Sequence, residues 1–433
     1  MKLLLPLAAL FVLTACGGGS GEAGSPNSQV AVKAPLKITA MQSTTCGGSV
    51  AATKAELFVY DNNWNITGRY KAGADGSFTL ATEAKLLNFS LINNLGTHIK
   101  PKISQKVYSQ VEPGDYGTVF VGHNSDNCEC VEASATITKL SSSPLVQMRV
   151  SNETMQFSFA KLNGNTATLN LCRQQGKNWP ALAIAARNTA GSWAYARLDN
   201  YQPTQPLFIN LDKEVQALPF TTNNTAATYS SYSYTQDLAY RALTANADAP
   251  VQINGLTQIK YLTHTATLRT VQSNGDGTMI DLFSTHNLLR KTADSSALNF
   301  VIPEWSKVET FAATAAKDWA KFANGFAYDY SSFAEFTALN VDVSVYFPEG
   351  NYIEQQFTGP LKGKFPASFL PADYLALTVM DTVDHSYVSI DLSQLSSANN
   401  LTAYVRQNLK LAAPLVSQRE REGDFSYIGF AVQ

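Results

Sequence analysis

Apolar and polar residues alternate along most of this chain, and that period predicts β-strands. Residues 146–150 and 155–159 alternate in this way, as half-buried strands do. Asn163-Gly164 then gives a two-residue hairpin turn, and 167–171 forms the return strand. Two further strands are predicted at 193–198 and 207–211. Short strands at this spacing favour a β-sandwich or a propeller over βαβ units.

The N-terminal part has the same period, with turn residues between its apolar runs. The predicted strands are 55–60, 66–70, 77–80, 89–91 and 119–121. Ala74-Asp75-Gly76 is a tight-turn signal before the third of them. The run Ala55 to Tyr60, followed by Gly68 and by 74–78, resembles the carboxypeptidase-regulatory-like, transthyretin-like β-sandwich. This resemblance implies a spacer or interaction module with no catalytic residues.

One stretch breaks the strand pattern and predicts a helix near 304–324. Its apolar residues recur every three or four positions: Trp305, Val308, Ala312, Ala315, Trp319 and Phe322. Pro303 precedes them, and Asn324-Gly325 is a helix stop. Tryptophans in such a stripe belong to core packing more often than to a ligand platform. Later strands are predicted at 341–345, 374–380, 387–392 and 425–432.

The predicted fold class is therefore mainly β, with tandem β-sandwich-like domains and one substantial helix. A partial β-propeller is the alternative for the C-terminal part. The polar linker at 141–144 separates a domain at 35–140 from one at 145–300. A third domain, which contains the helix, is expected at 301–433.

The first residues have the composition of an export signal. Lys2 precedes an apolar run over 3–12 that is too short to span about 30 Å of hydrocarbon. Leu13-Thr14-Ala15-Cys16 closely resembles the lipobox of bacterial lipoproteins. That resemblance implies cleavage before Cys16 and acylation of Cys16 with fatty acids such as palmitate. The alternative is an ordinary secretory signal with a chance cysteine.

The expected topology follows from that resemblance. Residues 1–15 are the predicted lipoprotein signal peptide, and 16–34 are the lipidated cysteine and a flexible tether rich in Gly, Ser, Pro and Asn. In such lipoproteins an aspartate after the cysteine retains the protein at the inner membrane, and here that position is Gly17. The resemblance therefore implies a lipid anchor in the outer membrane of a bacterial cell envelope. The body would face either the periplasm or the outside.

Four cysteines remain once Cys16 is assigned to lipidation. In an exported protein an even remainder predicts two disulfide bonds. A bridge between Cys128 and Cys130 would close a strained ring, so Cys46 and Cys172 are expected to pair with these two cysteines in either order. A metal site is the alternative, but the spacing lacks Cys-x-x-Cys pairs and nearby histidines.

Composition excludes several functional classes. Charged residues make up 15% of the chain and the formal net charge is −2, so a nucleic-acid partner is not expected. Beyond Gly17 the sequence has no apolar run of about 20 residues that would form a second membrane anchor. Catalytic sequence motifs such as Gly-x-Ser-x-Gly, His-Glu-x-x-His and nucleotide-binding loops are missing from it as well.

The polar stretch 221–240 contains the candidate ligand-contact residues. They are Tyr229, Tyr232, Tyr234 and Tyr240, set among Ser, Thr and Asn. Rigid amphipathic rings in an adaptable polar setting are typical of glycan or protein contact surfaces. The alternative is a polar loop whose tyrosines pack down on the sandwich.

Three other polar clusters have a structural interpretation that we favour over a functional one. His98, Lys100, Lys102 and Lys106 either contact anionic lipid or protect an edge strand from pairing. Residues 273–277 are similar to half of a calcium loop but are better explained as a hairpin turn. Asp381, Asp384, His385 and Ser386 either orient an imidazole or a cation or form a solvated turn.

These observations predict a non-catalytic, lipid-anchored envelope protein with a binding, adhesion or structural role. The expected partners are the membrane and a protein or glycan, and we expect no cofactor, metal or catalytic residue. One alternative is a hydrolase of envelope glycans or peptidoglycan, because two carboxylates that meet only in space leave no sequence trace. A structural subunit of a larger envelope complex is the other.

Overall fold

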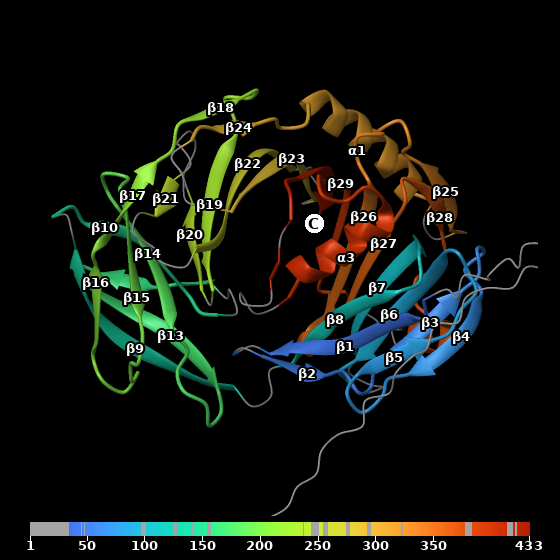
Figure 1. The fold of residues 1–433 in the computed structure, drawn as a ribbon, viewed down its shortest axis with the longest axis horizontal. Helices are drawn as coiled ribbons and strands as arrows, with labels where there is room; N and C mark the ends of the chain where they lie inside the picture. The colour runs from blue at the N-terminus through green and yellow to red at the C-terminus, as the bar shows by residue number, and fades with distance from the viewer. Residues whose placement is uncertain are drawn as a thin grey trace, which may run out of the picture. The chain divides into compact units, whose positions relative to one another are not determined.

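A computed structural model describes residues 34–433 except 45, 47, 97–100, 125–127, 140–141, 154–156, 237, 244–250, 254–258, 274–277, 292–295, 322–323, 377–382, 414–418 and 421. The fold is mainly β, as predicted, and its strands form several sheets (Figure 1). In this part of the chain, no helix combines the length and the hydropathy needed to span a bilayer.

The largest sheet joins strands from widely separated parts of the sequence. Among the described residues it has twelve strands, in the order β20 (Ala239–Leu243), β19 (Thr228–Thr235), β22 (Ile259–Ser273), β23 (Met279–Arg290), β30 (Phe425–Val432), β29 (His385–Leu395), β26 (Ala338–Phe347), β27 (Asn351–Gly359), β7 (Lys102–Val111), β6 (Leu87–Asn94), β3 (Glu56–Tyr60) and β4 (Ile66–Lys71). The pairing of β27 with β7 is parallel and links residues about 250 positions apart, such as Gln356 and Lys106. This pair joins the N-terminal strands of the sheet, β7, β6, β3 and β4, to its C-terminal strands.

A smaller sheet covers the N-terminal strands of the large one. It contains β2 (Ser49–Ala51), β1 (Leu36–Thr44), β5 (Ser77–Leu80) and β8 (Asp115–Asn124), which pairs in parallel with β1. Leu36, Ile38 and Val119 from this sheet share one apolar core with Leu57 and Phe89 from the large sheet. The N-terminal strands predicted from sequence are confirmed, whereas the transthyretin-like resemblance stays a prediction.

The middle of the chain forms two facing sheets. One contains β11 (Phe157–Phe159), β10 (Leu145–Ser151), β14 (Leu182–Asn188), β15 (Trp193–Leu198), β17 (Lys213–Ala217) and β21 (Val251–Ile253). The other contains β12 (Lys161–Asn163), β13 (Thr166–Gln174), β9 (Cys128–Lys139) and β16 (Leu207–Leu211). Val150 and Ile184 from the first pack with Ala135, Leu169 and Ile209 from the second. Because inward residues of both sheets share this core, the arrangement is a β-sandwich.

Two disulfide bonds form, as predicted, one within the β-sandwich and one between it and the N-terminal region. Cys46 bonds to Cys128, and Cys130 bonds to Cys172. The structure therefore selects one of the two pairings that the sequence left open. Cys130 on β9 and Cys172 on β13 are direct cross-strand partners. Cys46 lies two residues after the end of β1. The two bonds therefore link the start of β9 to β13 and to the segment that follows β1.

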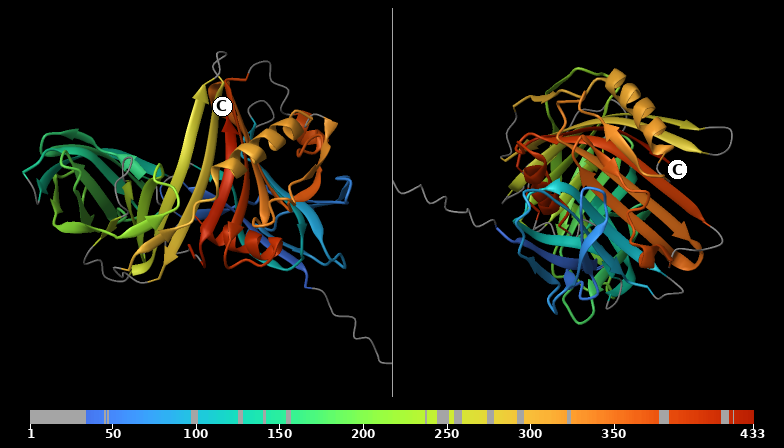
Figure 2. Two further views of the ribbon diagram at one scale, coloured as in Figure 1. Left: turned by 90° about the horizontal axis from the view of Figure 1, so that it is seen from above. Right: turned by 90° about the vertical axis from the view of Figure 1, so that its right-hand side faces the viewer.

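The predicted helix is confirmed as α1 (Trp305–Trp319), which lies across the large sheet (Figures 1 and 2). Val308, Phe311 and Ala315 are its buried residues, so the stripe serves core packing. A second helix, α3 (Leu401–Leu411), was not predicted, although Asn400 caps it by accepting a hydrogen bond from the backbone N–H of Ala403. The remaining elements are α2 (Ala372–Leu375), η2 (Pro348–Gly350), β18 (Phe220–Thr222), β24 (Leu298–Phe300), β25 (Phe326–Asp329) and β28 (Lys362–Phe365).

Three details differ from the sequence predictions. The strand predicted at 374–380 is wrong at its start, because Pro371 precedes a helical turn and Tyr374 lies in α2. The edge-strand interpretation of the lysine cluster is wrong for Lys102 and Lys106, because β7 pairs on both sides, with β6 and β27. The propeller alternative is wrong because the C-terminal strands lie in one large sheet instead of separate four-stranded blades.

The division into domains at 35–140, 145–300 and 301–433 stays a prediction about folding units. Strands from all three ranges belong to the large sheet, and 34–433 forms one compact unit. Strands that precede the linker at 141–144 and strands that follow it therefore belong to the same sheet.

Candidate functional site

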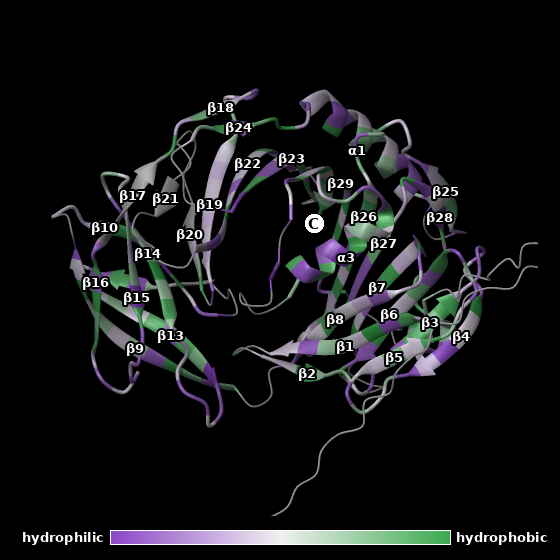
Figure 3. Ribbon diagram, in the orientation of Figure 1, coloured by the Kyte–Doolittle hydropathy of each residue, from purple (hydrophilic) through white to green (hydrophobic). Residues whose placement is uncertain are grey.

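The candidate site lies on the polar face of the large sheet, where β26, β27 and β29 are neighbours. Polar and apolar residues alternate along these strands (Figure 3), and successive side chains of a strand point to opposite faces of the sheet. On one face Val341, Ile390 and Phe357 are buried in the core that includes Phe311 of α1. The opposite face therefore carries the polar residues between them, including Asn340, Asp342 and Asp391.

Register brings these polar residues together. Asn340 of β26 pairs directly with Asp391 of β29 and with Thr358 of β27. Asp342 pairs with Ser389 and Gln356, so Asp342 and Asp391 are diagonal neighbours on adjacent strands. Because direct partners point to the same side, both carboxyl groups face the same space.

That space is a cavity of about 270 Å³, which we call the polar cavity. Its lining combines amide, carboxyl and hydroxyl groups with aromatic rings: Asn340, Asp342, Gln356, Thr358, Asp391, Ser393, Tyr404, Asn408, Phe425 and Tyr427. Phe357 also borders the cavity, but its ring is buried in the core on the opposite face. The side chains of Tyr404 and Asn408 come from α3, which was not foreseen in the sequence. The helix is therefore needed to complete the cavity wall.

A hydrogen-bond network fixes the inner side chains. The two hydrogens of the Asn340 amide Nδ2 are shared among three acceptors, Asp391 Oδ1 at 3.0 Å, Ser393 Oγ at 2.8 Å and Tyr404 Oη at 3.2 Å. Asn340 Oδ1 accepts from Thr358 Oγ1 at 3.1 Å. Ser393 Oγ also donates to Asp391 Oδ1. Networks in which each member is bonded restrict side-chain motion, so this wall is preorganised.

The environment shifts the acidity of both carboxyl groups in the same direction. Burial raises the pKa of Asp391 to about 7, against the opposing effect of its bonds to Ser393 and Asn340, and the nearby Asp342 raises it further. The pKa of Asp342 is raised mainly by burial and lowered by the charge of Lys106, with Glu354 raising it. Near neutral pH the Asp391 carboxyl group therefore exists in two forms, a protonated one that can donate a hydrogen bond and an ionised one that only accepts.

Lys106 supplies the neighbouring positive charge. It lies on β7 and donates a hydrogen bond to Gln356 Oε1. Burial lowers the pKa of Lys106, and the charges of Asp342 and Glu354 oppose that effect. The polar face thus carries charges of both signs, placed by strands that are far apart in sequence.

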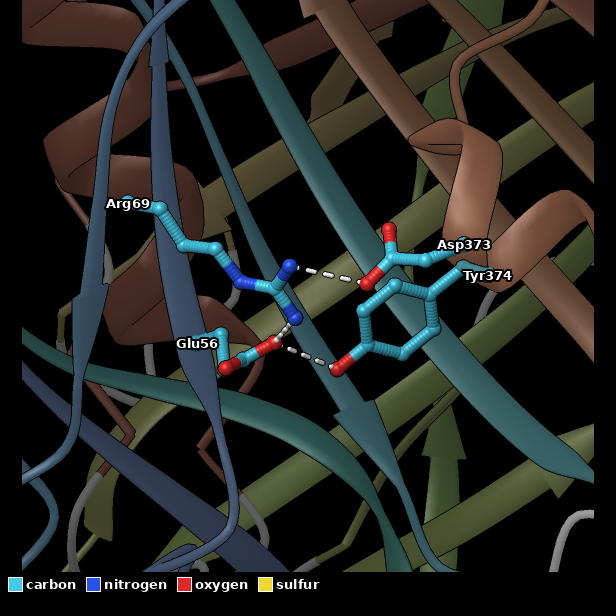
Figure 4. A network of polar contacts seen from close by, with 4 residues as sticks. All are labelled: Glu56, Arg69, Asp373 and Tyr374. Carbon is cyan, nitrogen blue, oxygen red and sulfur yellow. Dashed lines mark hydrogen bonds and ion pairs between the residues drawn. The ribbon is translucent and has the colours of Figure 1, made fainter.

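A second polar network holds α2 against β3 and β4 and serves a structural purpose (Figure 4). The Arg69 guanidinium bonds to Glu56 at 2.5 Å and to Asp373 at 2.8 Å, and Tyr374 Oη donates to Glu56 Oε2 at 2.9 Å. The guanidinium also lies over the Phe58 ring, 4.9 Å from its centroid. Since Glu56 is buried, Arg69 compensates a charge that would otherwise be costly to bury.

The tyrosines predicted as ligand contacts lie in the strands β19 and β20. Tyr229, Tyr234 and Tyr240 are less than a tenth exposed, and Tyr232 is half-buried. Tyr229 packs on Phe300, and the Tyr234 ring stacks on Tyr261 with centroids 4.3 Å apart. Three of the four rings thus pack inward, and their role in ligand contact stays a prediction.

The other predicted sites have mixed outcomes. Cys16, His98, Lys100 and Asp381 lie outside the described residues. The hairpin interpretation of 273–277 is confirmed by the pairing of β22 with β23, although 274–277 themselves are outside the described part. His385 Nδ1 lies 3.1 Å from Asp384 Oδ2, both side chains are exposed, and Ser386 is exposed too. Among the described residues, no group of three or more His, Cys, Asp or Glu side chains could hold a metal ion.

The residues of the polar cavity were missed in the sequence, although two signals were present. Asp342 and Asp391 each stand within a short alternating strand, where aspartate is disfavoured. A carboxylate at such a position indicates a polar face of the sheet. Their meeting could not be predicted, because it depends on which strands are neighbours.

Comparisons with known proteins add no functional information. No protein-family model and no curated protein matches this chain. Among solved structures, the TIE protein of Bacillus anthracis is similar at 9% identity and a TM-score of 0.14, over 62% of this chain and 50% of that one. The structure of a streptococcal ancillary pilin is similar at 7% identity and a TM-score of 0.13, over 62% of this chain and 100% of that one. This chain thus matches half of the length of the first structure.

Proposed function

We propose that this protein is a lipid-anchored component of a bacterial outer membrane that binds a neutral, hydroxyl-rich ligand such as an envelope glycan. The observation that supports binding is the polar cavity, whose lining offers donors, acceptors and aromatic rings within one small space. Hydroxyl groups of a sugar need both donors and acceptors, and the amides of Gln356 and Asn408 provide both. Ring faces of the kind that Tyr427 and Phe425 offer suit the apolar side of a sugar.

The anchor part of the proposal is supported by Leu13-Thr14-Ala15-Cys16. The two disulfide bonds agree with export to an oxidising compartment. Radiolabelled palmitate should incorporate into the native protein and not into a Cys16→Ser variant. Equal labelling of both would contradict lipidation at this position.

Binding is tested by a panel of neutral envelope glycans offered to the full chain. Gln356→Ala/Asn408→Ala removes two cavity amides that are not part of the inner network, so the fold should persist. We expect this variant to bind the selected glycan about tenfold more weakly, as expected when two hydrogen bonds are lost. Asn170→Ala, at an exposed position on β13, is the matched control and should bind as the parent does.

A second candidate function is hydrolysis of that glycan, and the Asp342–Asp391 pair favours it. Diagonal neighbours on adjacent antiparallel strands lie about 7–8 Å apart, a spacing within the range of about 6.5–9.5 Å for inverting glycoside hydrolases. The raised pKa of Asp391 suits a general acid. Release of new reducing ends by the parent, but not by Asp342→Asn or Asp391→Asn, would establish hydrolysis. Binding without any release would leave the protein a binding module.

A further inference from the structure

A separate groove lies where β6, β7 and β28 meet the turn between β3 and β4. We call it the lysine groove; it has a volume of about 480 Å³ and is lined by Asn62, Trp64, Lys85, Leu86, Asn88, Ser109, Gln110, Gly363 and Lys364. Ser109 lies two residues after Val107 on β7. Val107 pairs with Phe357, and both residues are buried in the core on the apolar face. The lysine groove is therefore associated with the apolar face of the sheet and the polar cavity with the other face.

A β-bulge shapes the floor of the lysine groove. Leu87 pairs with Val111 but Phe89 pairs with Tyr108, so Ser109 and Gln110 together oppose one residue, Asn88. Asn88 Oδ1 accepts hydrogen bonds from Ser109 Oγ at 3.0 Å and from the Gln110 backbone N–H at 2.9 Å. The floor is thus polar and fixed by internal bonds.

The wall is an indole held in an uncommon backbone conformation. Trp64 has φ of 67°, and Gln110 has φ of 54°; residues other than glycine rarely adopt such backbone angles. The Asp61 carboxylate accepts hydrogen bonds from the backbone N–H groups of Asn63 and Asn65, which stabilises the turn. Trp64 Nε1 donates to the Lys364 carbonyl at 2.8 Å. Strain that the surroundings maintain in this way is found at functional sites.

The rim carries positive charge. Lys85 and Lys364 are both exposed, and none of the described residues that line the groove is acidic. The Asp61 carboxylate accepts the hydrogen bonds of the turn and keeps its charge, and it lies close enough to Lys364 for the two charges to interact. The groove therefore combines two cationic side chains, several amides and an indole.

We infer that the lysine groove binds an acidic saccharide, with its carboxylate between the two lysines. Ammonium groups bind carboxylates through charge-assisted hydrogen bonds. The amides of Asn62 and Gln110 suit sugar hydroxyls, and the indole of Trp64 suits the apolar face of a sugar ring. A volume in this range accommodates a small ligand. This inference does not depend on the polar cavity.

The test measures binding of a hexuronate oligomer to the full chain by calorimetry at low salt. The same oligomer with its carboxyl groups reduced to alcohols is the neutral comparison, and inorganic phosphate is the third probe. We expect the parent to bind the hexuronate at least about tenfold more tightly than the reduced oligomer. Phosphate should bind more weakly than the hexuronate, because it cannot use the indole.

Lys85→Gln/Lys364→Gln removes both charges and keeps an unbranched polar side chain that is slightly shorter than that of lysine. It should lower the affinity for the hexuronate at least about tenfold and leave binding of the reduced oligomer unchanged. Lys71→Gln/Lys161→Gln, at two exposed positions outside the groove, is the matched control and should behave as the parent does. Equal affinity for both oligomers, an unchanged affinity in the groove variant, or phosphate binding as tight as the hexuronate would overturn the inference. Variants of the polar cavity that no longer bind neutral glycan should still bind the hexuronate as the parent does, because the two sites share no lining residue. The two proposals can therefore fail separately.

Discussion

Replacing Asp391 by asparagine should stabilise the protein at alkaline pH and have no effect at acid pH. An aspartate in an unfolded chain has a pKa near 3.9, whereas burial raises the pKa of Asp391 to about 7 in the folded state. Between these values the folded protein retains a proton that the unfolded chain has released. The free energy of unfolding therefore falls as pH rises from about 4 to about 7 and stays low above that range.

The magnitude follows from the size of the pKa difference. A shift of about three units corresponds to about 4 kcal/mol if it acts in full. Asp391 is only partly buried and lines a cavity, so solvent screening reduces the effect and we expect about 2 kcal/mol. Asparagine can still accept the bonds from Asn340 and Ser393, so the variant should lose the charge and keep the network.

Urea unfolding of parent and variant at a series of pH values from 4 to 8 provides the measurement. The difference in unfolding free energy between the two proteins should be near zero at pH 4 and grow to about 2 kcal/mol in favour of Asp391→Asn at pH 8. Asp212→Asn, at an exposed position after β16, should change stability by less than about 0.5 kcal/mol at every pH. A difference that does not depend on pH, or a parent more stable at pH 8, would refute the reasoning.

Three further predictions concern the fold. Phe311→Ala should lower the free energy of unfolding by about 3–5 kcal/mol, since the ring is fully buried beneath the large sheet; a loss below 1 kcal/mol in urea unfolding would contradict this packing. Arg69→Ala should cost about 2 kcal/mol because it leaves the Glu56 carboxylate buried without its cation, and adding Glu56→Gln should recover part of that loss in a double-mutant cycle. Replacing Cys46 and Cys128 by serine should lower the melting temperature, with a cost of about 4 kcal/mol for a loop of 82 residues, whereas an unchanged melting temperature would show that the bond does not constrain the unfolded chain.

Local patterns were sufficient to predict most individual elements. The strands at 193–198 and 207–211 and the helix that begins at Trp305 are found as expected, because alternation and helical periodicity are properties of short segments. The sequence left two cysteine pairings open, because spacing along the chain does not determine whether Cys46 or Cys172 lies closer to Cys128. The capped helix α3 was missed although Asn400 precedes a periodic run, so its start signal was available.

The arrangement of those elements could not be predicted from the same patterns. Strand β7 pairs in parallel with β27, about 250 residues later, and parallel pairing of distant strands leaves no local signal. The polar cavity depends on that arrangement, because β26 and β29 must be neighbours before Asp342 and Asp391 can meet. Sequence analysis therefore allowed a carboxylate pair in general and could not name its members.

Hydrogen exchange of the full chain with and without its selected neutral glycan tests the central claim most directly. The claim is that the polar cavity is the ligand site. We predict that ligand slows backbone exchange in β26 around Asn340, in β29 around Asp391 and in α3 around Tyr404, which border this space. Slower exchange confined to other strands, with these three segments unchanged, would contradict it.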